Sequence, residues 1–163
     1  MQKKILGIVI LILCMLMSGC GNKDEKTPNT SVYYIDSELL MLIGVPSYCE
    51  GESSQEMAEN MLEKLRIGQD FNRKIKRQIP DIKNGMTVSV NEKTAVVNLS
   101  SEFVEKHSEG RIAEKLTVYQ IVNSLTSIDG IDYVRFTINS EECKCFKGFI
   151  DMREIFSHKD YVL

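Results

Sequence analysis

The chain is poor in the residues on which catalytic and phosphate-binding sites depend. Its 163 residues include only two histidines, His107 and His158, and both lie among charged neighbours, which predicts that both are on the surface. A nucleophilic site needs a base held against the nucleophile. The sequence contains no Gly-x-Ser-x-Gly elbow and no glycine-rich phosphate loop. We therefore expect no catalytic residue, no metal site and no cofactor.

An excess of basic residues is also missing. The chain has 20 lysines and arginines against 23 aspartates and glutamates, a net charge of -3. Because domains that bind nucleic acid usually carry a basic excess, nucleic acid is not an expected partner. The one basic cluster, Arg73–Arg77, suits anionic lipid headgroups, but such a run is more often a solvated helix face.

The one long hydrophobic run is too short to cross a membrane comfortably. Residues 5–17 are uncharged and apolar, whereas a spanning helix needs about 20 apolar residues. The run follows Lys3 and Lys4 and precedes small residues and Cys20, which is the order of a secretory signal. Residues 17–20 resemble the bacterial lipobox, whose cysteine is acylated. We expect a lipoprotein signal peptide at residues 1–19; the other interpretation is an uncleaved anchor helix with ordinary thiols.

The segment that follows is predicted to be a flexible tether. Residues 21–30 contain no hydrophobic side chain and so cannot pack against a core. With palmitate or a similar acyl chain on Cys20, the protein would be held at the extracytoplasmic face of the cell membrane. Two acyl chains make such an anchor stable. Membrane lipid is therefore one expected partner.

Residues 31–163 fit a single α+β domain. Apolar residues alternate along the central strands, which predicts a sheet covered on one side only. We predict two layers, a mixed or antiparallel sheet with two main helices on one face. Strands are expected at 32–35, 39–45, 86–90, 94–99 and 133–138, and helices at 53–68 and 112–128. A short helix at 71–78 and a final strand at 147–150 are also allowed by the pattern.

The same alternation predicts a polar, uncovered face on the central strands. This face contains Thr87, Ser89, Asn98, Arg135 and Thr137. A polar face opposite a buried one is available for a partner protein or for a second copy of the chain. We take these five residues as the candidate partner-binding site.

Three cysteines remain beyond Cys20, and the sequence leaves their state open. Cys49, Cys143 and Cys145 are expected to be reduced or to form one disulfide from Cys49. An odd number also allows a disulfide-linked dimer. A zinc site that uses Cys143 and Cys145 would lack a clear fourth ligand.

Two carboxylate pairs occur near predicted turns. Glu141 and Glu142 form one pair, and Asp129 and Asp132 form the other. Glycosidase chemistry needs two carboxylates across a cleft. The simpler interpretation is that all four are solvated charges.

Three segments carry a resemblance to a known family. Ala95–Phe103, Gln120–Thr126 and Gly130–Asn139 resemble, in this order, a strand with a phenylalanine turn, a helix and a following strand of the GerMN domain of spore-forming bacteria. The match covers roughly residues 32–151. The resemblance implies a non-catalytic extracytoplasmic module of sporulation or germination; the family's namesake has two such domains, and this chain has room for one.

The predicted function is therefore a membrane-anchored lipoprotein with a GerMN-like interaction or assembly module. Its partner would be another protein or another copy of itself. Two alternatives remain open at this point: a cell-wall enzyme such as a peptidoglycan hydrolase, with acid and base among the carboxylates, and a ligand-sensing lipoprotein.

Overall fold

Two sheets and three helices make up the described part of the chain. The computed structural model describes residues 26–36, 38–68, 75–76 and 79–160. Sheet A has the strand order β2-β1-β3, with β1 at Thr30–Asp36, β2 at Met41–Ser47 and β3 at Ile75–Lys76. Sheet B has the order β4-β5-β6, with β4 at Met86–Asn91, β5 at Thr94–Leu99 and β6 at Tyr133–Ile138. The helices are α2 at Ser54–Ile67, α3 at Ser101–Lys106 and α4 at Arg111–Leu125.

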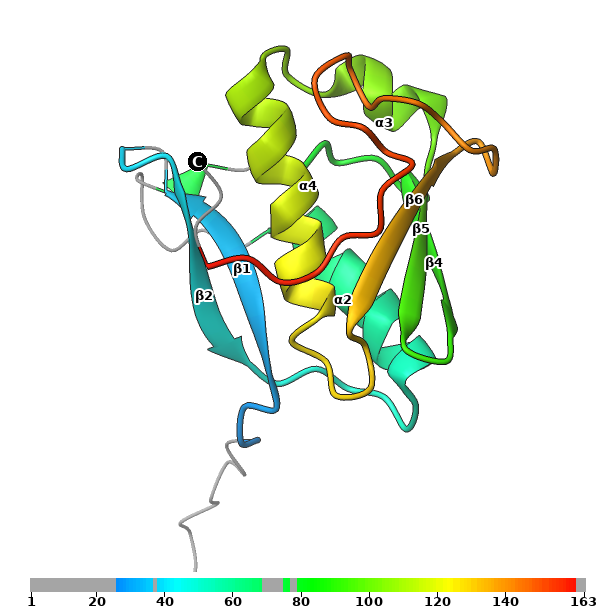
Figure 1. Ribbon diagram of the computed structural model, residues 1–163. Helices are drawn as coiled ribbons and strands as arrows, with labels where there is room; N and C mark the ends of the chain where they lie inside the picture. The colour runs from blue at the N-terminus through cyan, green and yellow to red at the C-terminus, as the bar shows by residue number, and fades with distance from the viewer. Residues whose placement is uncertain (1–25, 37, 69–74, 77–78, 161–163) are drawn as a thin grey trace, which may run out of the picture.

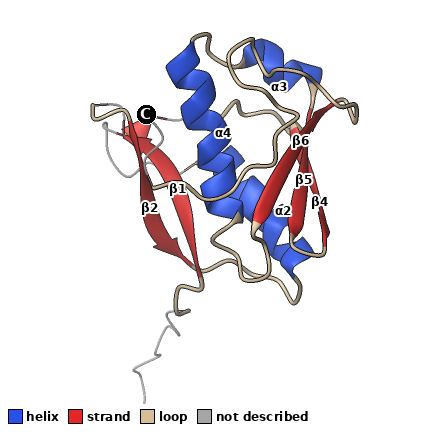
Figure 2. Ribbon diagram, viewed as in Figure 1, coloured by secondary structure: helices blue, strands red, loops and turns tan. Residues whose placement is uncertain are grey.

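Helix α4 lies between the two sheets, and α2 lies behind it in the view of Figure 1. Figure 2 shows the same arrangement by element type. Strands β4 and β5 are antiparallel, whereas β5 and β6 are parallel, so sheet B is mixed. The parallel pair needs a crossover connection, which α3 and α4 supply. The predicted α+β class is confirmed, and the structure adds that the strands divide into two sheets.

The central position of α4 explains its unusual sequence. Every residue from Leu116 to Leu125 is buried, including the polar Gln120, Asn123 and Ser124. Two serines at its end serve the backbone of β1: the Tyr33 amide donates to Ser124 Oγ over 2.9 Å, and the Ser31 amide donates to Ser127 Oγ over 3.0 Å. The C-terminal end of α4 therefore forms hydrogen bonds with the backbone of β1, and the helix also fills the core.

The two predicted hairpins are confirmed. Strands β1 and β2 pair antiparallel, and β4 and β5 pair from Met86 with Leu99 to Asn91 with Thr94. The second strand was expected to end at residue 45, before Pro46, but Pro46 lies inside β2, opposite Ser31. Proline is tolerated there because β2 is an edge strand and one side of its backbone has no strand partner.

The predicted helices begin and end close to the observed ones. Ser53 caps α2, since its Oγ accepts the Glu56 amide over 3.2 Å, and Gly68 closes the helix with a φ of 69°. The left-handed φ is one that glycine adopts without strain. Helix α4 ends at Leu125, three residues before the predicted Ile128, and Thr126 is its C-cap, whose amide and hydroxyl both donate to Val122 O.

Three details differ from the prediction. The proposed helix at 71–78 is wrong where it can be assessed, since Ile75–Lys76 form strand β3; the other residues lie outside the described ones. Helix α3 was not predicted, because six residues are too few for a helical period to show. The final strand at 147–150 is absent, and only an isolated bridge joins Cys145 to Asp151.

Candidate functional site

The candidate surface is the outward side of sheet B. Thr87, Ser89 and Arg135 are exposed there, and Asn98 and Thr137 are half-buried. Intervening residues Ala95, Val97, Leu99, Val134 and Phe136 are buried on the opposite side. The strands therefore bring the five residues predicted from the sequence onto one face, which also includes Val96. We call these six residues the open face.

Two shallow hollows mark the open face. One, of about 330 Å³, is lined by Thr87, Ser89, Val96, Asn98 and Thr137 among others. The second, of about 190 Å³, lies between Val96, Arg135 and Glu142. The half-buried Val96 is common to both hollows, so an apolar side chain lies between the two depressions.

Asn98 and Thr137 use their polar groups within the domain. The Thr137 hydroxyl donates to Asn98 Oδ1 over 3.1 Å, and the Ser140 amide donates to the same oxygen over 2.6 Å. Ser140 has a left-handed φ of 65°, so Asn98 holds a tight turn after β6. Asn98 and Thr137 therefore stabilise the open face. Fewer of their polar groups are available to a partner than the sequence pattern predicts.

Thr87, Ser89 and Arg135 are the open groups of the face. Arg135 Nη2 lies 3.5 Å from Glu142 Oε1, a long ion pair between exposed side chains. Such pairs contribute little to stability and are easily exchanged for another partner. The hydroxyls of Thr87 and Ser89 have no hydrogen-bond partner among the described residues.

His107 is a correction to the sequence analysis. It was expected on the surface, but it is 3% exposed, and its Nε2 lies 2.8 Å from Thr117 Oγ1. Its ring packs against Phe146 at 4.8 Å and Phe103 at 6.4 Å between centroids. Burial, together with the nearby charge of Lys147, lowers its pKa from 6.5 to about 4. The ring is therefore a neutral core group, and among the described residues the Thr117 hydroxyl is the side-chain group in hydrogen-bond contact with it.

His158 is exposed, as the sequence predicted. Its Nε2 lies 3.4 Å from Asp160 Oδ1, and its ring meets the Tyr33 ring edge-on at 5.4 Å. These contacts place it on the C-terminal segment beside sheet A.

The carboxylate pairs lie at opposite ends of β6. Asp129 and Asp132 precede this strand, whereas Glu141 and Glu142 follow it, and all four are exposed. Six strand residues span on the order of 20 Å, well beyond the separation of a glycosidase acid and base. Asp132 is paired with Lys93 Nζ at 2.9 Å. No cluster of three or more metal-ligating side chains occurs among the described residues.

The cysteines fall in two separate places. Cys49 is buried on the loop between β2 and α2, where its thiol donates to Met57 O over 3.2 Å. Cys143 and Cys145 lie in the loop after β6, and the Cys143 thiol donates to Cys145 O over 2.9 Å. All three are free thiols in the structure, and burial raises the pKa of Cys49.

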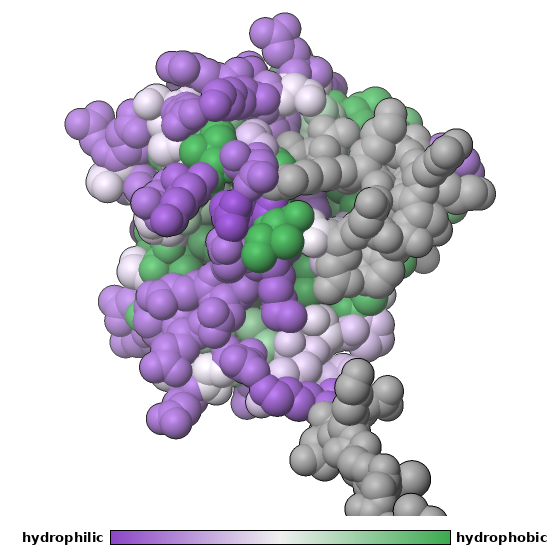
Figure 3. Space-filling model, turned by 180° about the vertical axis from the view of Figure 1, so that it is seen from behind, coloured by the Kyte–Doolittle hydropathy of each residue, from purple (hydrophilic) through white to green (hydrophobic). Residues whose placement is uncertain are grey.

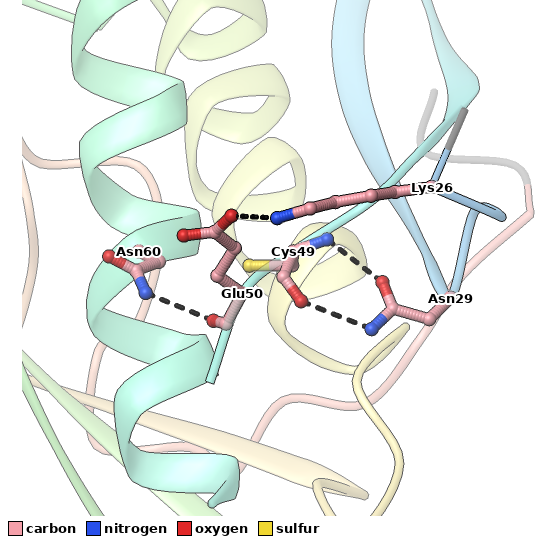
Figure 4. Close-up of polar contacts among 5 residues, drawn as sticks. All are labelled: Lys26, Asn29, Cys49, Glu50 and Asn60. Atoms are coloured by element: carbon pink, nitrogen blue, oxygen red, sulfur yellow. Dashed lines mark hydrogen bonds and ion pairs between the residues drawn. The ribbon is translucent and has the colours of Figure 1, made fainter. Parts of the chain in front are cut away.

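The start of the described chain is held against the domain. Asn29 pairs with the Cys49 backbone in both directions: its Nδ2 donates to Cys49 O over 3.0 Å, and its Oδ1 accepts the Cys49 amide over 2.8 Å. Lys26 forms an ion pair with Glu50, whose carbonyl accepts Asn60 Nδ2 over 2.9 Å (Figure 4). Lys26 and Asn29 belong to the segment predicted as a tether, and the sequence pattern did not predict their contacts with the domain. Cys20 lies outside the described residues.

Other side chains make the same kind of two-way contact with backbone. Gln55 bonds to Val88 O and to the Val90 amide, and Asn123 bonds to both backbone groups of Lys159. No local sequence pattern distinguishes Asn123 from the other polar residues of α4, such as Gln120 and Ser124.

None of the helices formed by the described residues has the length and apolar character needed to cross a membrane.

Comparisons with known proteins agree with this fold. The chain is similar to a crystal structure of a candidate lipoprotein from Clostridium perfringens, with a TM-score of 0.57, 16% identity and coverage of 71% of this chain and 72% of the other. It is also similar to the first GerMN domain of the Bacillus subtilis sporulation protein GerM, with a TM-score of 0.54, 22% identity and coverage of 80% and 93%.

The tandem GerMN domains of the same GerM protein match with a TM-score of 0.54 and 22% identity. The match covers 80% of this chain but 44% of the tandem, which corresponds to one of its domains. No curated protein matches the chain in sequence.

A family model named Germane, described as sporulation and spore germination, matches residues 31–144. This segment contains all of sheet A except Thr30, all of sheet B and the three helices. The chain therefore belongs to the Germane family.

Proposed function

We propose that this protein is a lipid-anchored, extracytoplasmic protein of sporulation or germination that binds a protein partner through the open face and catalyses no reaction. The partner is another protein or a second copy of the chain. Membership of the Germane family supports the biological setting. The described residues offer core packing around His107 and separated carboxylates in place of an active site.

The observation that carries the proposal is the combination of groups on the open face. Exposed Thr87, Ser89 and Arg135 surround the half-buried Val96 on a sheet whose β5 and β6 residues are buried on the other side. Protein interfaces commonly combine an apolar centre with a polar rim and are enriched in arginine. The open face has this composition over the small area of its six residues.

The lipid anchor is supported by the N-terminal sequence and by the fold similarity to a candidate lipoprotein. Because Asn29 and Lys26 are held by the domain, the chain from Cys20 to Lys26 can reach at most about 20 Å, its fully extended length. In this proposal the domain works close to the membrane surface, where its partner would also be found.

The direct test is co-purification of partners with the full chain from membranes of sporulating cells. Arg135→Glu reverses the exposed charge, and Thr87→Arg fills the larger hollow with a long side chain. We expect each variant to lose the captured partner by at least tenfold, because charge reversal and steric bulk both act at the contact surface.

Arg111→Glu is the matched control. Arg111 is exposed at the start of α4, away from sheet B, so reversal of its charge should leave capture unchanged. Unchanged capture by both open-face variants would rule out this face as the binding surface. Clearing of cell-wall material in a zymogram, lost on Asp132→Asn or Glu141→Gln, would instead favour a hydrolase.

A further inference from the structure

Strand β4 is the outer strand of sheet B, and half of its outward edge is already occupied. Gln55, from the first turn of α2, donates from Nε2 to Val88 O over 3.0 Å, and its Oε1 accepts the Val90 amide over 2.7 Å. A side-chain amide here forms the two bonds that a neighbouring strand would form. The contact shows that the Val88 carbonyl and the Val90 amide point away from β5 and form hydrogen bonds beyond the sheet.

The other half of this edge is open. Backbone groups alternate in direction along a strand, so Met86 points outward, as Val88 and Val90 do. No described residue beyond the sheet forms a hydrogen bond with the backbone of Met86. Unpaired edge groups are the usual template for strand addition.

A groove of about 420 Å³ lies along this open edge, between β4 and α2. Its apolar lining comes from Leu62, Met86 and Val88. Charged residues of α2 and of the segment before β4 form its rims, and the rear view in Figure 3 shows a largely hydrophilic surface with apolar areas between charged side chains.

The charged side chains on the rim of the groove differ in whether they already have an ion-pair partner. Arg66 is paired with Glu63 and Asp81. Glu59 accepts only the Gln55 amide and has no cationic partner among the described residues, and Lys83 has no ion-pair partner among them. An open carboxylate therefore lies near Val88, and an open ammonium group lies near the start of β4.

We infer that this groove binds an extended segment of another protein, which adds to sheet B beside β4. The segment carries a basic residue that faces Glu59, small apolar residues over Leu62 and Met86, and an acidic residue that faces Lys83. Antiparallel pairing is slightly more stable than parallel pairing. In that direction the basic residue comes first in the partner's sequence, because Gln55 and Glu59 lie toward the later part of β4.

The test uses two fluorescent peptides, Lys-Thr-Val-Thr-Val-Thr-Glu and Glu-Thr-Val-Thr-Val-Thr-Lys, with blocked ends, against the full chain in detergent. Fluorescence anisotropy should show at least tenfold tighter binding of the first peptide. The double variant Glu59→Lys with Lys83→Glu should reverse this preference. Hydrogen exchange should slow at Met86 and Val88 when the first peptide binds.

Met86→Pro removes the outward amide and leaves the bonds to β5 intact, so it should weaken binding of the first peptide at least tenfold. If Met86→Pro unfolds, the peptide preference of the double variant Glu59→Lys with Lys83→Glu decides whether the groove binds the segment. Failure of both peptides to bind, or an unchanged preference in the double variant, would overturn the inference. Binding of a soluble cell-wall disaccharide-peptide fragment in the groove in place of the peptides would also overturn it.

The groove and the open face meet at Thr87 and Val88, so the two proposals are separated by variants of residues that line only one of them. Arg135→Glu should leave peptide binding unchanged, because Arg135 lies on β6 and does not line the groove. A failure of the proposed function would therefore show in partner capture by Arg135→Glu, whereas a failure of this inference would show in the peptide measurements; Thr87→Arg is not used for this distinction, because Thr87 lines the groove as well.

Discussion

At the scale of single residues, polar groups in this domain mostly hold backbone segments together. Asn29, Gln55 and Asn123 each bond in two directions to a backbone segment distant in sequence. A buried amide or carbonyl without a partner costs about 1–3 kcal/mol. Side chains that satisfy such groups are therefore as important to the fold as apolar contacts.

His107 is the residue whose environment differs most from the sequence expectation. Its neighbours in sequence, Lys106 and Ser108, are exposed, so local pattern indicates a surface position. Burial comes from Phe103 and Phe146, and Phe146 is distant in the chain. Contacts of this kind cannot be read from local periodicity.

The lowered pKa of His107 predicts a loss of stability in mild acid. Above pH 6.5 the ring is neutral in both the folded and unfolded chain, and its contribution to stability is complete. Between pH 6.5 and about 4 the unfolded chain takes up a proton that the folded chain does not, so the free energy of unfolding falls. The shift corresponds to a loss of up to about 3 kcal/mol.

Urea unfolding of the wild type and His107→Phe at pH 7, 5.5 and 4 measures this effect. The variant should lose less stability across the range than the wild type, whereas His158→Gln should behave as the wild type does. Equal pH dependence in the wild type and His107→Phe would contradict the assignment of a buried neutral ring.

At the scale of elements, alternation predicted the strands of sheet B well. The pattern from Met86 to Leu99 and that of Tyr133–Ile138 have one buried side and one polar side, and these are the strands observed. The open face followed from the same alternation. Helix α4 was predicted to cover one face of a sheet. Its position between two sheets was not predicted, because its polar residues follow the pattern of a helix face exposed to solvent.

The groove could not be predicted from the sequence. It arises where α2 runs beside the edge of β4, and the relative placement of these elements depends on the whole core. Strand β3 is also too short to carry a pattern, since it has two residues. Residues that act through tertiary contacts are therefore the ones that sequence reasoning missed.

Glu114 joins α4 to the loop that follows Cys145. It is fully buried, and its two carboxylate oxygens accept the amides of Phe149 and Ile150 over 3.2 and 2.8 Å. Glu114→Ala should lower the free energy of unfolding by about 2 kcal/mol or more, because two amides lose a charged acceptor.

Thermal and urea unfolding measure the effect, with Glu109→Ala as the control, since Glu109 is exposed just before α4. Glu114→Gln should be intermediate, because it retains one acceptor oxygen. A loss in Glu114→Ala no larger than that in Glu109→Ala would show that the loop is held by other contacts.

At the scale of the whole molecule, the described chain begins near one end of the domain. Figure 1 shows the N-terminal segment leaving at the lower end, near the loop between β2 and α2, whereas α3 lies at the upper end. An anchor at Cys20 would place this lower end toward the membrane.

The proposed anchor predicts acylation at one residue. Cells that express the full chain and are fed an alkyne analogue of palmitate should label the protein, and Cys20→Ala should abolish the label and release the protein from the membrane fraction. Cys14→Ala is the matched control and should keep both. A label that persists in Cys20→Ala would contradict the anchor.

The most direct test of the central claim is photo-crosslinking from the open face in sporulating cells. A photoreactive residue at Ser89 should give a membrane-associated adduct of defined size, while the same residue at Glu109 should give none. The adduct should disappear when Arg135→Glu is combined with the Ser89 probe. Adducts from Glu109 alone, or from both positions equally, would contradict a binding surface on the open face of sheet B.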